Sequence, residues 1–374
     1  MYSVVSFGWM ASDGVRMDAY ARAIARVVKP GSVVVDIGAG TGVFSLLALR
    51  AGAKRVHAID PNPAVWLARE LAVENGFGDR LEVHDRASFD VDLAERADVV
   101  VSDLRGSFPL YDVHLATLAD ARKRLLAPGG VLLPAQDGLV AALVESERFF
   151  THVQRGWTGL ERHGFGAAAA RTSTVNTSYT DGETPVDANE VLTTAARWAT
   201  LRYGEPVPPV FEGTVELAPT RGGVAHAIAI WFEATILEGV GYTNAPGHRT
   251  VYSRTLLPLL EPVRVEHGEK VTLTLRADAT GARWAWETTF ANGRRMRQTT
   301  FLGMPTSAEA LLRASASFAP VRAPRGDRAA CVLAMMDGVH TVEQIAEAIA
   351  SSAPNLPREA LVEEVRSHAR RYGR

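Results

Sequence analysis

The stretch Val33-Val34-Val35-Asp36-Ile37-Gly38-Ala39-Gly40-Thr41-Gly42 decides the fold of the first third of this chain. Its three valines predict a short buried strand, and the glycines after them allow a tight turn. A helix is predicted over residues 43–50 and a second strand over residues 55–59, which ends at Asp60. Strands that alternate with helices in this way indicate a parallel, doubly wound sheet.

The same alternation continues up to Pro134 and predicts a Rossmann-like domain over residues 1–134. The turn Pro128-Gly129-Gly130 is expected to lead into the last strand of this domain. The further elements are helices over 64–75 and 113–126 and strands over 81–83, 98–102 and 131–133.

After Pro134 the pattern changes to β-type runs separated by turn signals such as Asn292-Gly293. They predict a mostly antiparallel, β-barrel-like domain over residues 135–320, with an arm within residues 158–190. Pro320 to Arg328 reads as a linker, and a capped apolar stripe from Thr341 predicts a small helical domain over 321–374. The predicted β-runs cover residues 138–145, 225–234, 250–257, 270–275 and 284–290.

Composition excludes several classes of protein. The 374 residues carry 40 Lys and Arg against 42 Asp and Glu, a net charge of −2 that argues against a nucleic-acid partner. Cys331 is the only cysteine, so the chain forms no internal disulfide, and no His, Asp and Glu grouping has metal-ligand spacing, so we expect no metal. With neither a long apolar run nor a signal peptide at the start, we expect a cytoplasmic protein without a membrane partner.

The glycine-rich turn predicts a cofactor site. Glycines there let the backbone approach a ligand, and the helix that follows offers free N–H groups. Such a turn also fits NAD, or a structural turn without ligand; an acid two residues before the first glycine favours the cationic amino-acid tail of S-adenosylmethionine (AdoMet). The carboxylate that closes the second strand is expected to accept hydrogen bonds from ribose hydroxyls. The predicted residues here are Asp36, Gly38, Gly40, Gly42, Asp60 and Pro61.

The segment Met10-Ala11-Ser12-Asp13-Gly14-Val15-Arg16 matches the Met-x-x-Asp-x-Val-Arg segment of the protein arginine methyltransferases, and the chain up to about residue 300 resembles that family. The resemblance implies that Arg16 binds the AdoMet carboxylate and that Ala87 and Ser88 lie against adenine. It places Met10 at the substrate. Because the chain begins just inside the family's N-terminal helix, we expect the lid over AdoMet to be mostly missing.

The family's acidic hairpin has a counterpart in Ser102-Asp103-Leu104-Arg105-Gly106 and Tyr111-Asp112-Val113-His114-Leu115. The resemblance implies that the two aspartates grip a guanidinium, as two glutamates do in the family. Each aspartate is shorter than glutamate by one C–C bond, roughly 1.5 Å. Arg105 and His114 both replace family methionines; we expect Arg105 to pair with Asp103 or bind a substrate carboxylate, and His114 to accept the released proton.

The loop Gly247-His248-Arg249-Thr250-Val251-Tyr252 stands where the family has its Thr-His-Trp loop. Tyr252 is expected to form an aromatic wall of the substrate pocket. Val251 replaces the family histidine, so the family's pair between that histidine and Asp13 cannot form.

The last domain resembles, more loosely, the peptide-binding domain of the pyrroloquinoline-quinone chaperone (PqqD) family. The resemblance rests on three segments: Leu333-Ala334-Met335-Met336-Asp337-Gly338, residues 341–349 and residues 360–372. It implies recognition of a leader peptide. A plain packing or dimer-supporting helical domain is the alternative.

Together these features predict an AdoMet-dependent N-methyltransferase that acts on a guanidino group of arginine, free, in a small molecule or in a peptide, and yields S-adenosylhomocysteine. The resemblance also implies a homodimer formed through an arm at residues 158–185. Two alternatives stay open: a methyltransferase for another N or O nucleophile of a natural product or peptide, and a non-catalytic AdoMet-binding scaffold.

Overall fold

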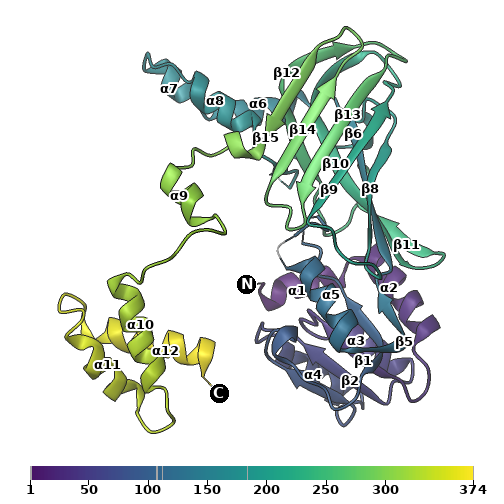
Figure 1. The fold of residues 1–374 in the computed structure, drawn as a ribbon. Helices are drawn as coiled ribbons and strands as arrows, with labels where there is room; N and C mark the ends of the chain where they lie inside the picture. The colour runs from purple at the N-terminus through teal and green to yellow at the C-terminus, as the bar shows by residue number, and fades with distance from the viewer. Residues whose placement is uncertain (1, 107, 112, 183, 374) are drawn as a thin grey trace. The chain divides into compact units, whose positions relative to one another are not determined.

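A five-stranded parallel sheet in the order β3-β2-β1-β4-β5 forms the first layer of the fold (Figure 1). The computed structural model describes residues 2–106, 108–111, 113–182 and 184–373. The strand order reverses beside β1, and ligands bind at such switch points in doubly wound sheets. The strands are β1 (Val33–Ile37), β2 (Arg55–Ile59), β3 (Leu81–His84), β4 (Ala97–Ser102) and β5 (Leu126–Leu133).

Helices cover both faces of this sheet, so β1 is buried along its whole length. Val34 packs in one core with Ala48 and Ala68, whereas Val35 packs in another with Ala121. The helices are α1 (Val4–Ala11), α2 (Gly14–Val27), α3 (Val43–Arg50), α4 (Val65–Glu74) and α5 (His114–Arg124), with the 3₁₀ turn η1 (Ser88–Asp90).

Two antiparallel sheets follow and form the β-barrel-like part in the upper half of Figure 1. The strands of the first sheet, in the order β7-β12-β10-β6-β8 with β11 on β10, are β6 (Gln136–Val144), β7 (Tyr179–Thr180), β8 (Ala196–Arg202), β10 (Gly223–Leu237), β11 (Val240–Thr243) and β12 (Thr255–Val265). The second sheet, β15-β14-β13-β9, comprises β9 (Val210–Leu217), β13 (Val271–Asp278), β14 (Trp284–Thr289) and β15 (Arg295–Thr299).

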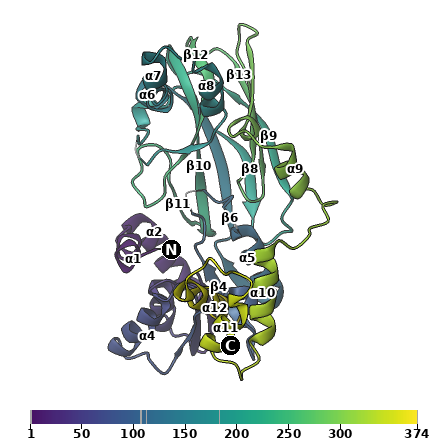
Figure 2. The ribbon, with the colours of Figure 1, turned by 90° about the vertical axis from the view of Figure 1, so that its left-hand side faces the viewer.

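Helices α6 (Glu147–Arg155), α7 (Thr158–Arg162) and α8 (Ala168–Val175) occupy the arm region predicted from sequence. Both views place them at the end of the antiparallel sheets that is far from the parallel sheet (Figures 1 and 2). The 3₁₀ turns η2 (Ala188–Glu190) and η3 (Thr300–Leu302) lie in later connections.

Several predicted boundaries are wrong. The strand expected over 250–257 is β12, which begins at Thr255 and runs through two prolines where its register with β10 shifts. Pro128-Gly129-Gly130 lies inside β5 and does not precede it. Strands β8, β9 and β15 were not predicted, because polar residues interrupt their apolar pattern and only part of each strand is buried.

The chain divides into two compact units, residues 1–305 and 306–374. The second unit has its own core, formed by Val332, Ile345, Ile349 and Val365. Its helices are α9 (Ala308–Arg313), α10 (Pro324–Met335), α11 (Val342–Ala350) and α12 (Arg358–Tyr372). The linker predicted up to Arg328 is therefore too long, because proline is well accommodated at the first position of a helix. Among the described residues, no helix has both the length and the apolar character needed to cross a membrane.

Candidate active site

A cavity of about 950 Å³ opens at the carboxyl ends of β1, β2 and β4. This is the switch point of the parallel sheet, and α1, η1 and the loop before β12 close its sides. The predicted site residues that line the cavity are Met10, Arg16, Gly38, Asp60, Pro61, Ala87, Ser88, Asp103 and Tyr252.

The glycine-rich turn forms the floor of the cavity in left-handed backbone conformations. Gly38 has φ +74° and Gly40 has φ +52°, values that residues other than glycine rarely adopt. A Cβ at Gly40 would lie 2.4 Å from the Phe7 ring, so α1 packs directly on the turn. Phe7 and Met10 of the short helix α1 line one side of the cavity, and the expectation that the lid is mostly missing stays a prediction.

Two carboxylates flank the turn. Asp36 Oδ2 accepts hydrogen bonds from Ser45 N (2.9 Å) and Ser45 Oγ (2.7 Å), whereas the buried Oδ1 has no hydrogen-bond partner among the residues that the structure describes. Burial raises the pKa of Asp36 to about 7, although the bonds from Ser45 oppose the shift. Asp60 lines the cavity and accepts from Gly40 N and Asn62 N, each at 2.8 Å. An unpartnered oxygen beside a glycine-built cavity fits a cofactor with a cationic amino group.

Arg16 projects from α2, where the N-cap Asp13 fixes the start of the helix by accepting from Arg16 N at 3.2 Å. Its Nε donates to Asp103 Oδ2 (2.6 Å) and its Nη1 donates to the Met10 carbonyl (2.9 Å). Burial opposes the charged guanidinium, but the nearby Asp103 carboxylate outweighs it and raises the pKa of Arg16. Arg16 thus stays cationic at the cavity wall, as a ligand for a carboxylate requires.

The Asp103 side chain accepts three hydrogen bonds from other side chains. Its Oδ2 accepts from Arg16 Nε and also from Tyr252 Oη (2.6 Å), and its Oδ1 accepts from Arg105 Nη1 (2.5 Å). Burial acts to raise the pKa of Asp103, but the charges of the two arginines and the Tyr252 hydroxyl lower it to about 2. Two guanidinium groups of the chain itself therefore already surround the carboxylate predicted to bind a substrate guanidinium.

Arg105 does not line the cavity, so the prediction that it contacts substrate is wrong. It is fully buried, and its Nε and Nη2 donate to the two oxygens of Asp137 on β6 at 2.8 and 3.1 Å. Its Nη1 donates to Tyr20 Oη (2.8 Å) as well as to Asp103. The prediction that Arg105 pairs with Asp103 is confirmed.

His114 is also buried away from the cavity, with 1 % of its surface exposed. Its Nε2 lies 3.1 Å from Tyr203 Oη, which donates to Asp137 Oδ2. Burial and the charge of Arg105 lower the pKa of His114 to about 3, so it cannot hold a released proton at neutral pH. The predicted proton-accepting role of His114 is therefore wrong. Asp112, the second predicted acid, lies outside the described residues.

The loop before β12 meets α2 without the family histidine. Asp13 Oδ2 accepts from the backbone N of Val251 (2.9 Å), so a main-chain bond joins the two segments instead. Sequence reasoning missed Asp137 and Tyr203, which complete the network behind Asp103. An acid at the start of β6, just before its apolar run, was the available signal, because a buried carboxylate needs a cationic partner.

Comparison with known proteins places the chain among methyltransferases. The sequence profile of the ribosomal protein L11 methyltransferase (PrmA) family matches residues 20–142. Two solved structures share the fold. The Trypanosoma brucei PRMT1 enzyme–prozyme heterotetrameric complex with AdoHcy matches with a TM-score of 0.71 and 22 % identity, over 78 % of this chain and 96 % of that chain. Arabidopsis thaliana protein arginine methyltransferase 10 matches with a TM-score of 0.68 and 20 % identity, over 80 % of this chain and 98 % of that chain.

Curated relatives agree with this placement. Protein arginine N-methyltransferase 1 of Oryza sativa subsp. indica is 27 % identical over 272 residues, which cover 70 % of this chain and 69 % of the relative. The arginine N(omega)-methyltransferase of Streptomyces achromogenes subsp. streptozoticus is 30 % identical over 276 residues, 71 % of this chain and 74 % of that enzyme. With this identity and coverage, the chain belongs to the family of AdoMet-dependent arginine N-methyltransferases.

Proposed function

We propose that this enzyme methylates a guanidino nitrogen of arginine, either free, in a small molecule or in a peptide. The observation that carries the proposal is the ionised Asp103, which lies on the cavity wall between the glycine turn and Tyr252. Relatives named for arginine methylation, including a bacterial one, support the same acceptor.

The residues of the proposed site divide into two groups by their roles. Asp36, Asp60 and Arg16 hold the amino, ribose and carboxylate groups of AdoMet, with Ala87 and Ser88 against the adenine ring. AdoMet supplies an electrophilic methyl group, which passes to the acceptor nitrogen while the sulfur keeps the bonding electrons.

On the acceptor side, Asp103 and Asp112 orient the guanidinium, and the Tyr252 ring lines the pocket beside it. The acceptor nitrogen loses one proton as it gains the methyl group. Because the pKa of Asp103 is about 2, this carboxylate orients the acceptor but does not retain that proton, which passes to solvent.

A transfer assay with labelled AdoMet tests this proposal. Free arginine, arginine-containing peptides and guanidine-free acceptors are compared by mass spectrometry, and a single added methyl on arginine is expected. Asp112→Asn should abolish turnover while AdoMet still binds, whereas the exposed Asp79→Asn should behave as the wild type. Full activity of Asp112→Asn would contradict the assigned role.

A second acceptor class is favoured by one specific observation. Asp103 is already neutralised by Arg16 and Arg105, so it attracts a further cation less than a free carboxylate would. This arrangement suits an uncharged N or O nucleophile of a natural product or peptide. Methylation of guanidine-free acceptors alone would select this candidate, and tight AdoMet binding without any product would select a non-catalytic scaffold.

We also propose that the chain forms a homodimer through its arm. Phe165 of the arm is 63 % exposed, and Trp9 and Val5 of α1 are 70 % and 68 % exposed, so both surfaces offer apolar area to a second copy. Light scattering at micromolar concentration should give a dimer mass that Phe165→Ser reduces. A monomer mass for the wild type would contradict the proposal.

We also propose a separate role for each of three regions. Residues 1–134 bind the cofactor, residues 135–320 form the acceptor pocket and the dimer interface, and residues 321–374 recognise a peptide. Leu333 and Val339 are exposed in the last region and offer apolar contacts. An arginine peptide with its leader should be methylated faster than the same peptide without it, and Leu333→Ser should remove the difference. The proposed location is the cytoplasm, which cell fractionation tests.

A further inference from the structure

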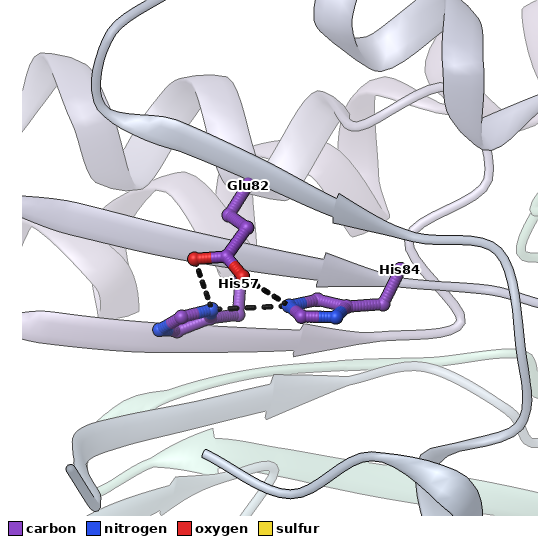
Figure 3. Close-up of side chains that lie close together, drawn as sticks. All are labelled: His57, Glu82 and His84. Carbon is purple, nitrogen blue, oxygen red and sulfur yellow. Dashed lines mark hydrogen bonds and ion pairs between the residues drawn. The ribbon is translucent and has the colours of Figure 1, made fainter. Parts of the chain in front are cut away.

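Three potential metal ligands converge at the edge of the parallel sheet (Figure 3). His57 lies on β2, and Glu82 and His84 lie on the neighbouring edge strand β3. In the parallel pairing, His57 stands opposite Glu82 and Ile59 stands opposite His84. Because residues two apart on a strand share a face, all three side chains lie on one face of the sheet.

The separations of the donor atoms match those around a tetrahedral metal. His57 Nδ1 and His84 Nε2 lie 3.1 Å apart. Glu82 Oε2 lies 3.4 Å from His57 Nδ1, and the other carboxylate oxygen, Glu82 Oε1, lies 3.5 Å from His84 Nε2. Ligand atoms placed about 2.0 Å from a tetrahedral Zn²⁺ are about 3.3 Å from one another. We propose that His57, Glu82 and His84 form a zinc site with its fourth position open to water.

Hydrogen bonding alone accounts poorly for this triangle. One proton can lie between the two imidazole nitrogens, and the contacts with Glu82 are then left at 3.4 and 3.5 Å, longer than good N–H···O bonds. A single cation at the centre would satisfy both nitrogens and the carboxylate together.

The surroundings keep the histidines ready to bind a metal. The His57 side chain is 6 % exposed and the His84 side chain is 15 % exposed, so packing holds both rings in place on the sheet. The Glu82 side chain is half exposed, which leaves water access to the fourth position. Arg55 Nη1 lies 4.0 Å from Glu82 Oε2 and is the nearest competitor for the carboxylate.

Zinc here would act structurally, away from the reacting atoms. It would join the edge strand β3 to β2, and both strands lead directly into the cavity. Asp60 follows β2, and Ala87 and Ser88 follow β3. The expectation of no metal was based on spacing along the chain, whereas pairing of two strands brings these ligands together.

Zinc titration of the tag-free full-length chain tests the site. Metal is removed with a chelator, and Zn²⁺ is then added in competition with a chromophoric chelator. The wild type and Glu95→Gln, a neighbouring exposed acid outside the cluster, should each bind one equivalent with equal affinity. Glu82→Gln and His84→Gln should bind at least about tenfold more weakly, since even outer-shell changes cost that much.

Two further measurements distinguish the loss of a zinc ligand from misfolding of the variant. Tryptophan fluorescence without metal shows whether each variant is folded, and Glu82→Gln is the key variant because its side chain is half exposed. Cobalt substitution should give the visible absorption of a tetrahedral centre in the wild type and in Glu95→Gln, but not in Glu82→Gln. The proposal is overturned if the wild type binds no zinc, or if folded Glu82→Gln binds zinc as tightly as Glu95→Gln.

Discussion

Replacing Arg105 by methionine should strongly destabilise the unit formed by residues 1–305. The guanidinium donates two hydrogen bonds to Asp137 and one each to Tyr20 and Asp103, and the Arg105 and Asp137 side chains are both 0 % exposed. After the change, the Tyr203 hydroxyl is the one side-chain partner that Asp137 keeps among the described residues. Removing one member of a buried ion pair typically costs about 3–5 kcal/mol, because the other charge stays buried without compensation.

Two further variants separate this cost from a general packing effect. Arg197→Met breaks a pair with Glu233 that is 48 % and 47 % exposed, and such surface pairs contribute only about 0–1 kcal/mol. The double variant Arg105→Met/Asp137→Leu removes both buried charges and should recover at least half of the loss, since apolar replacements of buried pairs are often neutral.

Urea unfolding followed by tryptophan fluorescence measures these differences. The chain has seven tryptophans, and all of them precede residue 306, so their signal reports the first unit alone. A loss below about 1 kcal/mol for Arg105→Met, equal to that of the Arg197→Met control, would refute the reasoning.

Three other perturbations have defined outcomes. Burial raises the pKa of Asp36 to about 7, so its carboxylate gains negative charge as the pH rises through 7. The affinity for AdoMet, measured by calorimetry, should therefore rise by up to about tenfold per pH unit below pH 7. Asp36→Asn should flatten this dependence of affinity on pH. Gly40→Ala places a Cβ 2.4 Å from the Phe7 ring at φ +52°, so AdoMet should bind more weakly in the same titration, and unchanged affinity would contradict the packing of α1 on the turn. Thr341→Ala removes the capping box of α11 and should lower the unfolding free energy of the second unit by about 1 kcal/mol, seen by circular dichroism without a shift in the fluorescence transition.

The sequence was sufficient for the parallel sheet because its signals are local. An apolar strand, a glycine turn and a helix lie next to one another in the chain, and the prediction of α3 over residues 43–50 is confirmed to the residue. The antiparallel strands were harder to predict. In β15 arginines alternate with Met296 and Gln298, and only the fold shows that Gln298 is buried and donates to the Pro258 carbonyl.

The residues of the site also differ in how well the sequence predicted their positions. Gly38, Asp60 and Arg16 were placed correctly at the cavity because each lies in a short motif. Arg105 and His114 were misplaced because their partners, Asp137 and Tyr203, come from strands far along the chain. The direction of a polar side chain depends on which distant partner compensates its burial, and local spacing holds no such information.

The ion pair between Arg105 and Asp137 also restricts how this enzyme can be recombined with its relatives. Residue 134 looks like a natural crossover point for a chimaera, because the parallel sheet ends there. A graft at that point separates Arg105 from Asp137 and Tyr203. A donor barrel with an apolar residue in place of Asp137 would leave the buried Arg105 with Asp103 as its acidic partner, and Arg16 already shares that carboxylate. Module exchange between this enzyme and its relatives therefore requires Arg105 and Asp137 to be inherited together.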